Sequence, residues 1–184
     1  MALIRTARLS DANAIQAIYA PFCLTNAYAS FEYMPPDVDE MKLRMETVQI
    51  SLPWLVYEES NKVIGYALAS QYQVRAAYGW SVSVSIYLAA EARGRGVGKK
   101  LYTELFEILR RLGYFNAYAG ITLPNPGSVA LHKSMGFTQV GLTPKVGYKG
   151  GAWHDVLLLA LELQPHILEP PAPKKFDGSF HAQV

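Results

Sequence analysis

The stretch EARGRGVGKKLYTELFEILRRLG, residues 91–113, constrains the fold more than any other part of the chain. Three glycines occupy every second position in a basic segment, and a helical pattern of apolar residues follows at once. Alternating glycines let successive backbone N–H groups point to one side, and the start of a helix adds positive potential. The stretch therefore predicts a loop that holds a diphosphate in front of an amphipathic helix.

Two familiar phosphate loops do not match this stretch. The mononucleotide pattern G-x-x-x-x-G-K-[ST] requires serine or threonine where this chain has Lys100. The dinucleotide pattern G-x-G-x-x-G also fails, because a run that starts at Gly94 ends on Lys99 and one that starts at Gly96 ends on Leu101. Nucleotide binding through either pattern is thereby excluded, and another diphosphate carrier is expected.

Hydrophobic periodicity predicts a mixed α/β sheet. We expect strands at 2–7, 54–59, 62–70, 80–88, 114–123, 137–142 and 153–163. Four helices are expected to begin at the N-cap Ser10, near Asp37, after the glycine loop and at Pro126. Residues 1–164 are expected to form one domain. Residues 165–184 contain four prolines and are expected to drape over that domain or to fray.

Composition narrows the class of protein. A formal net charge of +2 is too small for wholesale nucleic-acid binding, although a local basic patch stays open. The single cysteine excludes an internal disulfide and favours a reducing compartment. The N-terminus lacks the apolar core of a signal peptide, and the longest aliphatic run, VLLLAL, is too short to cross a bilayer. Four scattered histidines give no metal-site spacing. We expect a cytoplasmic protein without metal, membrane or nucleic-acid partner.

Several segments carry a family resemblance. The pattern Arg93-x-x-Gly96-x-Gly98 resembles the coenzyme A pyrophosphate loop of the GNAT superfamily of N-acetyltransferases. The segment NPGSVALHKSMGF, residues 125–137, resembles the second cofactor segment of that superfamily. GYKGGAWHDV, PWLVYE and RAAYGWSV are similar to segments of the phosphinothricin acetyltransferases, a family that includes methionine sulfone and sulfoximine acetyltransferases. The resemblance covers about residues 3–163.

The resemblance implies a GNAT fold, with a central mixed, mostly antiparallel sheet flanked by about four helices. It implies an N-acetyltransferase that uses acetyl-CoA as co-substrate, without a metal. The acetyl group would pass to the α-amine of a small amino-acid-like substrate by direct attack. A homodimer with its active site near the interface is also implied.

The resemblance assigns roles to individual residues. The residues implied in cofactor binding are Ile86, Tyr87, Leu88, Arg93, Gly94, Arg95, Gly96, Val97, Gly98, Asn125, Ser128 and Ser134. The residues implied in substrate binding are Phe31, Arg75 and Tyr78. His132 stands where many GNAT proteins carry the tyrosine that protonates the departing thiolate, and is therefore a candidate catalytic acid, or a base that acts through water.

One position departs from the family. Where phosphinothricin acetyltransferases carry a glutamate in a W-x-V-E pattern, this chain has Ser83. Serine is not a base by itself, but Ser83 can order a water that carries the proton away. An α-amine with a pKa of 7.7–8.0 is roughly one tenth neutral at pH 7, whereas a lysine amine is neutral in under about one thousandth. The loss therefore favours a small α-amino acid over protein lysine as acceptor.

Three alternatives stay open. The chain can be an acetyltransferase for another amine, such as a polyamine, an aminoglycoside or a protein N-terminus, although no strongly acidic motif favours a cationic acceptor. It can be a coenzyme A-binding module with weak catalysis, for which Ser83 is the main argument. It can also bind RNA through RGRG, which requires a wider basic stripe. Gln73, at a position where the family often has lysine, puts phosphinothricin itself in doubt.

Overall fold

The computed structural model describes residues 2–24 and 28–183. In this part of the chain one mixed sheet has the strand order β6-β7-β5-β4-β3-β2-β1-β8. The strands are β1 (Ala2–Thr6), β2 (Trp54–Glu59), β3 (Lys62–Gln71), β4 (Ser81–Leu88), β5 (Asn116–Thr122), β6 (Thr138–Lys149), β7 (Ala152–Glu162) and β8 (His181–Gln183). The α-helices are α1 (Ala12–Cys23), α2 (Val38–Gln49), α3 (Val97–Leu112) and α4 (Pro126–Ser134). The predicted α/β class is confirmed.

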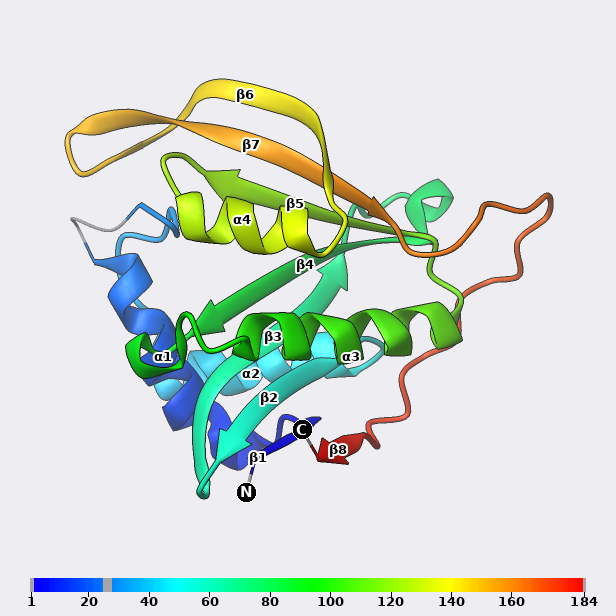
Figure 1. The fold of residues 1–184 in the computed structure, drawn as a ribbon, viewed down its shortest axis with the longest axis horizontal. Helices are drawn as coiled ribbons and strands as arrows, with labels where there is room; N and C mark the ends of the chain where they lie inside the picture. Colours follow the sequence, from blue (N-terminus) through cyan, green and yellow to red (C-terminus); the bar gives the residue numbers. More distant parts are fainter. Residues whose placement is uncertain (1, 25–27, 184) are drawn as a thin grey trace.

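The helices cover both faces of the sheet (Figure 1). Helices α1 and α2 pack on one face, in a cluster that includes side chains of β2 and β3. Helices α3 and α4 lie on the other face, over a larger cluster. The long β6–β7 hairpin extends beyond the helices at one edge of the molecule (Figure 1). The two helix layers thus bury both faces of the central strands.

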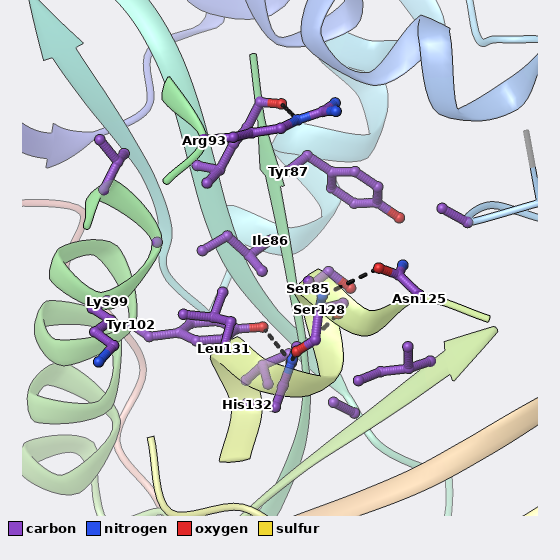
Figure 2. A pocket seen from close by; sticks show the side chains of 18 of the residues that line it. Ser85, Ile86, Tyr87, Arg93, Lys99, Tyr102, Asn125, Ser128, Leu131 and His132 are labelled. Atoms are coloured by element: carbon purple, nitrogen blue, oxygen red, sulfur yellow. Dashed lines mark hydrogen bonds between the residues drawn. The ribbon is translucent and has the colours of Figure 1, made fainter. Parts of the chain in front are cut away.

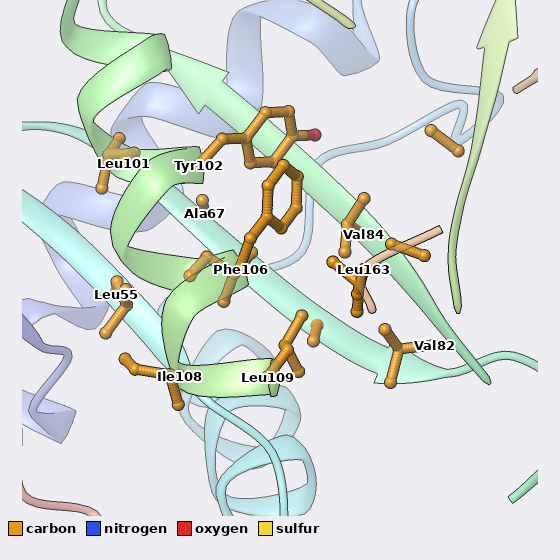
Figure 3. Packing of buried hydrophobic residues seen from close by; sticks show 14 of the residues in the cluster. Leu55, Ala67, Val82, Val84, Leu101, Tyr102, Phe106, Ile108, Leu109 and Leu163 are labelled. Atoms are coloured by element: carbon orange, nitrogen blue, oxygen red, sulfur yellow. The ribbon is translucent and has the colours of Figure 1, made fainter. Parts of the chain in front are cut away.

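The alternating pattern of residues 81–88 explains how α3 docks. Val82 and Val84 are buried beneath α3, while the intervening serines face the other side of the sheet. From α3, Leu101, Leu105 and Leu109 contribute fully buried side chains to the same cluster. Figure 3 shows two of them, Leu101 and Leu109. Each fully buried leucine stabilises the fold by roughly 1.5–3 kcal/mol relative to exposure. This stripe fixes the helix, and the loop in front of it, against the middle of the sheet.

The sheet forks between β4 and β5. These two strands are parallel and pair only where Ser81–Ser83 meet Asn116–Tyr118. Beyond this point β4 continues to Leu88 and β5 to Thr122 without pairing to one another. Because β4 stays paired with β3 and β5 with β7, each strand keeps one partner and opens one edge. The result is a V-shaped gap inside an otherwise continuous sheet.

Three local expectations were wrong. The N-cap position of helix α1 is Asp11 rather than Ser10, which lies in a short 3-10 helix. The Asp11 carboxylate makes no capping hydrogen bond to α1, because it is turned to the buried Arg5 guanidinium, which donates two hydrogen bonds to it. Strand β6 runs on to Lys149, seven residues past the expected end at 142, and crosses two register shifts opposite β7. Strand β8 was not expected, because a three-residue strand leaves no periodic signal.

The segment after Leu163 lies across the molecule. Two of its backbone N–H groups donate to carbonyl oxygens of separate regions, Lys174 N to Leu112 O at 2.7 Å and Phe176 N to Ser51 O at 3.0 Å. The Phe176 side chain is 8% exposed and belongs to the α3 cluster. Strand β8 then pairs antiparallel with β1 (Figure 1). The segment thereby connects the end of α3 to the opposite edge of the sheet.

Candidate active site

A cavity of about 540 Å³ occupies the fork between β4 and β5. Its walls are residues 84–88 of β4, residues 119–122 of β5, the loop and first turn of α3, and α4 (Figure 2). Phe22 of α1 and Ala29 close it on the remaining side. A cavity of this size accommodates an extended organic ligand.

The edge of β4 supplies backbone groups to this cavity. Along a strand, N–H and C=O groups point alternately to the two neighbours. Because Val84–Leu88 have β3 on one side and the fork on the other, half of their backbone groups face the cavity. Buried backbone groups need partners. The open edge, which includes Ile86, Tyr87 and Leu88, therefore suits an amide-containing chain laid along it.

The glycine loop ends at the cavity with an anion-binding geometry. Gly94 and Gly96 have φ angles of 71° and 78°, a region that side chains disfavour, so glycine is required to turn the backbone here. Gly96 is the N-cap of α3, and the next three residues, Val97, Gly98 and Lys99, line the cavity. The first N–H groups of a helix have no partner within it and attract negative charge.

The two arginines of the loop point to different places. Arg93 lines the cavity, with its guanidinium 5.2 Å from the centre of the Phe22 ring. The Arg95 guanidinium donates to both carboxylate oxygens of Glu59, at 2.8 and 2.9 Å, and Arg95 does not line the cavity. The geometry favours Arg93, and not Arg95, as the loop cation available to a ligand.

Helix α4 presents its first turn to the cavity. The Asn125 side-chain oxygen accepts a hydrogen bond from Ser128 N at 3.1 Å, which caps the helix. Both residues line the cavity. Ser134 lies at the other end of α4, exposed, with its hydroxyl bonded to Leu131 O at 2.8 Å. Of these three expected contacts, the cavity gathers two.

His132 is held between two hydrogen bonds. Its Nδ1 lies 2.8 Å from the Ser128 carbonyl oxygen and its Nε2 lies 2.9 Å from the Tyr102 hydroxyl. A carbonyl only accepts, so Nδ1 carries the hydrogen and Nε2 accepts from the tyrosine (Figure 2). Burial lowers the pKa of His132 and raises that of Tyr102. The pair is therefore neutral at pH 7, with both residues at the cavity wall.

Tyr102 is the wall residue that sequence reasoning missed. It is fully buried and sits next to Leu101 in α3, where a tyrosine reads as a core residue. It differs from an ordinary core residue only in its hydroxyl, which bonds to His132. Among the described residues that line the cavity, none is an aspartate or a glutamate. The wall thus holds neutral titratable groups and the cations Arg93 and Lys99.

The residues expected to contact the amine substrate lie around the apex of the fork or outside the cavity wall. Ser83 is the last residue of β4 that pairs with β5, opposite Tyr118. Tyr118 stacks on Tyr72 at 4.3 Å, and Tyr72 in turn contacts Tyr78. The remaining two expected residues, Phe31 and Arg75, do not line the cavity. A cluster of three tyrosines therefore joins Tyr78 to β5, at the residue that pairs with Ser83.

The described residues contain neither a helix that is long and apolar enough to span a bilayer nor a gathered set of metal-ligating side chains. The cavity is thus built from backbone groups, arginine and lysine, and the His132–Tyr102 pair. A forked sheet with a helix N-terminus at its open end defines a site for a ligand that combines diphosphate and amide groups.

Comparison with known proteins identifies the family of this chain. The model of the acetyltransferase (GNAT) domain matches residues 4–158. Phosphinothricin N-acetyltransferase of Alcaligenes faecalis is 39% identical over 158 residues, 85% of this chain and 80% of that protein. The L-methionine sulfoximine/L-methionine sulfone acetyltransferase of Salmonella typhimurium is 35% identical over 164 residues, 89% of this chain and 95% of that protein.

A solved structure gives the same answer. The crystal structure of a GNAT superfamily phosphinothricin acetyltransferase from Sinorhizobium meliloti, in complex with AcCoA, has a TM-score of 0.85 and 38% identity. The match covers 97% of this chain and 95% of that chain. The chain therefore belongs to the GNAT acetyltransferase family, an enzyme family, and the expected fold and family are confirmed.

Proposed function

We propose that this protein is an acetyl-CoA-dependent N-acetyltransferase that acetylates the α-amine of a small amino-acid-like substrate. One observation carries the proposal: the free N-terminus of α3 and the open edge of β4 line a single cavity. Relatives named for phosphinothricin and for methionine sulfoximine or sulfone support the acceptor class.

Acetyl-CoA fits the polar groups of the cavity. The N–H groups at the start of α3, with Arg93, would hold the pyrophosphate. The open edge of β4 would pair with the amides of pantetheine, and Asn125 and Ser128 border the same arm. This arrangement brings the thioester towards the apex of the fork, where Ser83 and Tyr118 lie.

The reaction that suits this geometry is direct attack. A neutral amine adds to the thioester carbonyl, a backbone N–H of β4 stabilises the negative charge on oxygen, and the C–S bond then breaks. The new amide loses the amine proton, and the departing thiolate takes up a proton. The cavity wall has no carboxylate among its described residues, and both ring nitrogens of His132 are held in hydrogen bonds. The amine proton would therefore reach His132 Nε2 through water and the Tyr102 hydroxyl, which would pass its own proton to Nε2 as it takes one from the water.

A homodimer is part of the proposal. Apolar side chains stand exposed along the β6–β7 hairpin: Val140, Leu142, Val146, Tyr148, Trp153 and Leu158. Exposed apolar side chains concentrated on one hairpin favour association with a second copy of the chain, as the family resemblance implies. Sedimentation analysis measures the state directly. A cytoplasmic location, proposed from the single cysteine, accompanies it.

A thiol-release assay tests the function. Acetyl-CoA is offered with a panel of amino acids that includes phosphinothricin and methionine sulfone, together with a polyamine and an aminoglycoside. We expect turnover with at least one α-amino acid. Tight acetyl-CoA binding without turnover of any amine would support a weakly catalytic coenzyme A-binding module instead.

Ser83→Glu provides the matched gain-of-function test in the same assay. A carboxylate at the apex of the fork would act as general base, and we expect kcat to rise at least about tenfold on the accepted amino acid. Ser81→Glu, one alternation earlier on the same face of β4, is the control and should not raise kcat. An unchanged kcat in the Ser83 variant would mean that another group already accepts the proton.

A further inference from the structure

Lys149, at the end of β6, is a buried lysine that the proposed reaction does not use. Lys149 is only 1% exposed, and among the described residues it takes part in no ion pair. Its ammonium group instead donates to three backbone carbonyls, Ser30 O at 2.7 Å, Glu32 O at 2.8 Å and Cys23 O at 3.2 Å. A lysine ammonium has three N–H groups, so every donor is matched.

The three carbonyls belong to the end of α1 and to the segment that follows it. Desolvation lowers the pKa of Lys149, which shows that burial of this cation opposes its charge. A buried cation persists only where its hydrogen bonds compensate for lost water. Because Ser30 and Glu32 flank Phe31, the lysine fixes the backbone on both sides of that aromatic residue.

The Phe31 ring lies directly on Gly147 of the same strand. A Cβ atom on Gly147 would stand 2.2–2.7 Å from three atoms at the far end of the ring, so only glycine leaves the ring in its present position. Tyr33 adds a third attachment, since its hydroxyl donates to Tyr148 O at 2.6 Å. Residues 28–33 are thus attached to β6 at three consecutive places.

The same segment reaches the cavity. Ala29 forms part of the cavity wall, one residue before the first carbonyl that Lys149 holds in this segment. Phe31 is 36% exposed and its ring lies 6.4 Å from that of His154 on β7. The position of Ala29 and Phe31 relative to the fork therefore depends on where β6 holds the segment.

We propose that Lys149 is a positioning residue for the amine acceptor: it fixes residues 28–33, which supply Ala29 to the cavity wall and hold Phe31, outside that wall, for contact with the acceptor. This inference rests on the proposed function and adds to it the residue that positions the segment next to the acceptor. Lys149 does not touch the reacting atoms. It acts through the three carbonyls, and Gly147 acts with it by leaving room for the Phe31 ring.

Two variants test the inference by different routes. Lys149→Met keeps the bulk of the side chain and removes the three donors. Gly147→Ala keeps the lysine and displaces the Phe31 ring, in backbone that has no positive φ at this position. Lys42→Met, on the exposed surface of α2, makes the same chemical change as Lys149→Met away from the cavity and is the control.

The steady-state measurement varies methionine sulfone and acetyl-CoA separately. Both Lys149→Met and Gly147→Ala should raise KM for methionine sulfone about tenfold, because small misplacements of binding groups weaken productive contacts strongly. KM for acetyl-CoA should stay within about twofold, as it should for both substrates in Lys42→Met. Equal rises in both KM values would indicate general damage to the fold, and an unchanged KM for methionine sulfone in both variants would overturn the proposal.

Hydrogen exchange separates this proposal from the proposed function. In Lys149→Met, peptides covering residues 28–33 should exchange faster while those of α3 and α4 keep the wild-type rate. If wild-type protein acetylates no amine in the panel, the proposed function fails, and this measurement still decides whether Lys149 holds the segment. Wild-type exchange of residues 28–33 in the variant would refute the role of Lys149 whatever the activity.

Discussion

His132 combines a candidate catalytic role with a measurable effect on stability. Its Nδ1 donates to Ser128 O and its Nε2 accepts from the Tyr102 hydroxyl, so protonation would add a second N–H that faces a donor. Burial accordingly lowers the pKa of His132 below the ordinary value of 6.5. As the pH falls through 6.5, His132 binds a proton in the unfolded chain but stays neutral in the folded chain. The free energy of unfolding therefore decreases as the pH falls from 6.5 to the lower pKa of the folded state. The stabilisation that neutral His132 provides is complete only above pH 6.5.

His132→Asn is predicted to change both catalysis and this pH dependence. Catalytic involvement predicts that kcat falls about 10²-fold, in the range of a lost general base, with little change in KM for acetyl-CoA. The loss of Tm below pH 6.5 should also be shallower than in wild type. Thiol release and thermal melts between neutral and mildly acidic pH measure the two effects. His166→Asn, at an exposed histidine, is the control. Wild-type turnover in His132→Asn would remove His132 from the mechanism.

At the scale of elements, local spacing within the chain predicts the glycine loop but not the fork. Local spacing of glycines and of Leu101, Leu105 and Leu109 fixes the loop and the helix within one stretch of chain. The fork depends on where β4 stops pairing with β5, and no pattern within either strand encodes that register. The family resemblance assigns Ile86, Tyr87 and Leu88 to cofactor binding, and all three line the cavity. It also assigns Arg95, which does not line the cavity and pairs with Glu59 of another strand.

Lys149 and Tyr102 show why the rest of the site escaped prediction. In the sequence each looks ordinary, a lysine before two glycines and a tyrosine inside a helical stripe. Their roles come from partners that are distant in the sequence. Ser30 and Glu32 lie 119 and 117 residues from the lysine, and His132 lies 30 residues from the tyrosine. The periodicity of a single sequence predicts which side chains are buried, but it does not predict which residues they contact.

Gly96→Ala tests the loop as an element. At φ 78° an alanine is strained by about 1–2 kcal/mol, and the strain acts on the N–H groups that open α3. We expect a lower free energy of unfolding and weaker acetyl-CoA binding by calorimetry. Gly127→Ala, in α4 with no atom within 4 Å of the added Cβ, should not lower stability. Unchanged acetyl-CoA affinity in Gly96→Ala would argue that the diphosphate is held elsewhere.

At the scale of the whole molecule, the segment after Leu163 links the end of α3 to β1. It passes from β7 to the end of α3, places Phe176 in the core, and ends as β8 on the outer edge of β1. An uncovered edge strand exposes unpaired backbone groups, and β8 removes part of that exposure. The proline content of the segment leaves open whether it drapes over the domain or frays, because its contacts come from single residues separated by extended chain.

Phe176→Ala is predicted to destabilise the whole molecule. Truncating a buried phenylalanine costs about 3–5 kcal/mol, since both apolar burial and packing are lost. Leu168→Ala, in the same segment but 96% exposed, should stay within about 0.5 kcal/mol of wild type. Urea unfolding followed by circular dichroism measures both free energies. If the two variants unfold at the same urea concentration, the segment does not contribute to the core in solution. If only Phe176→Ala shifts, the apolar cluster beneath α3 includes a side chain supplied from beyond the last long strand.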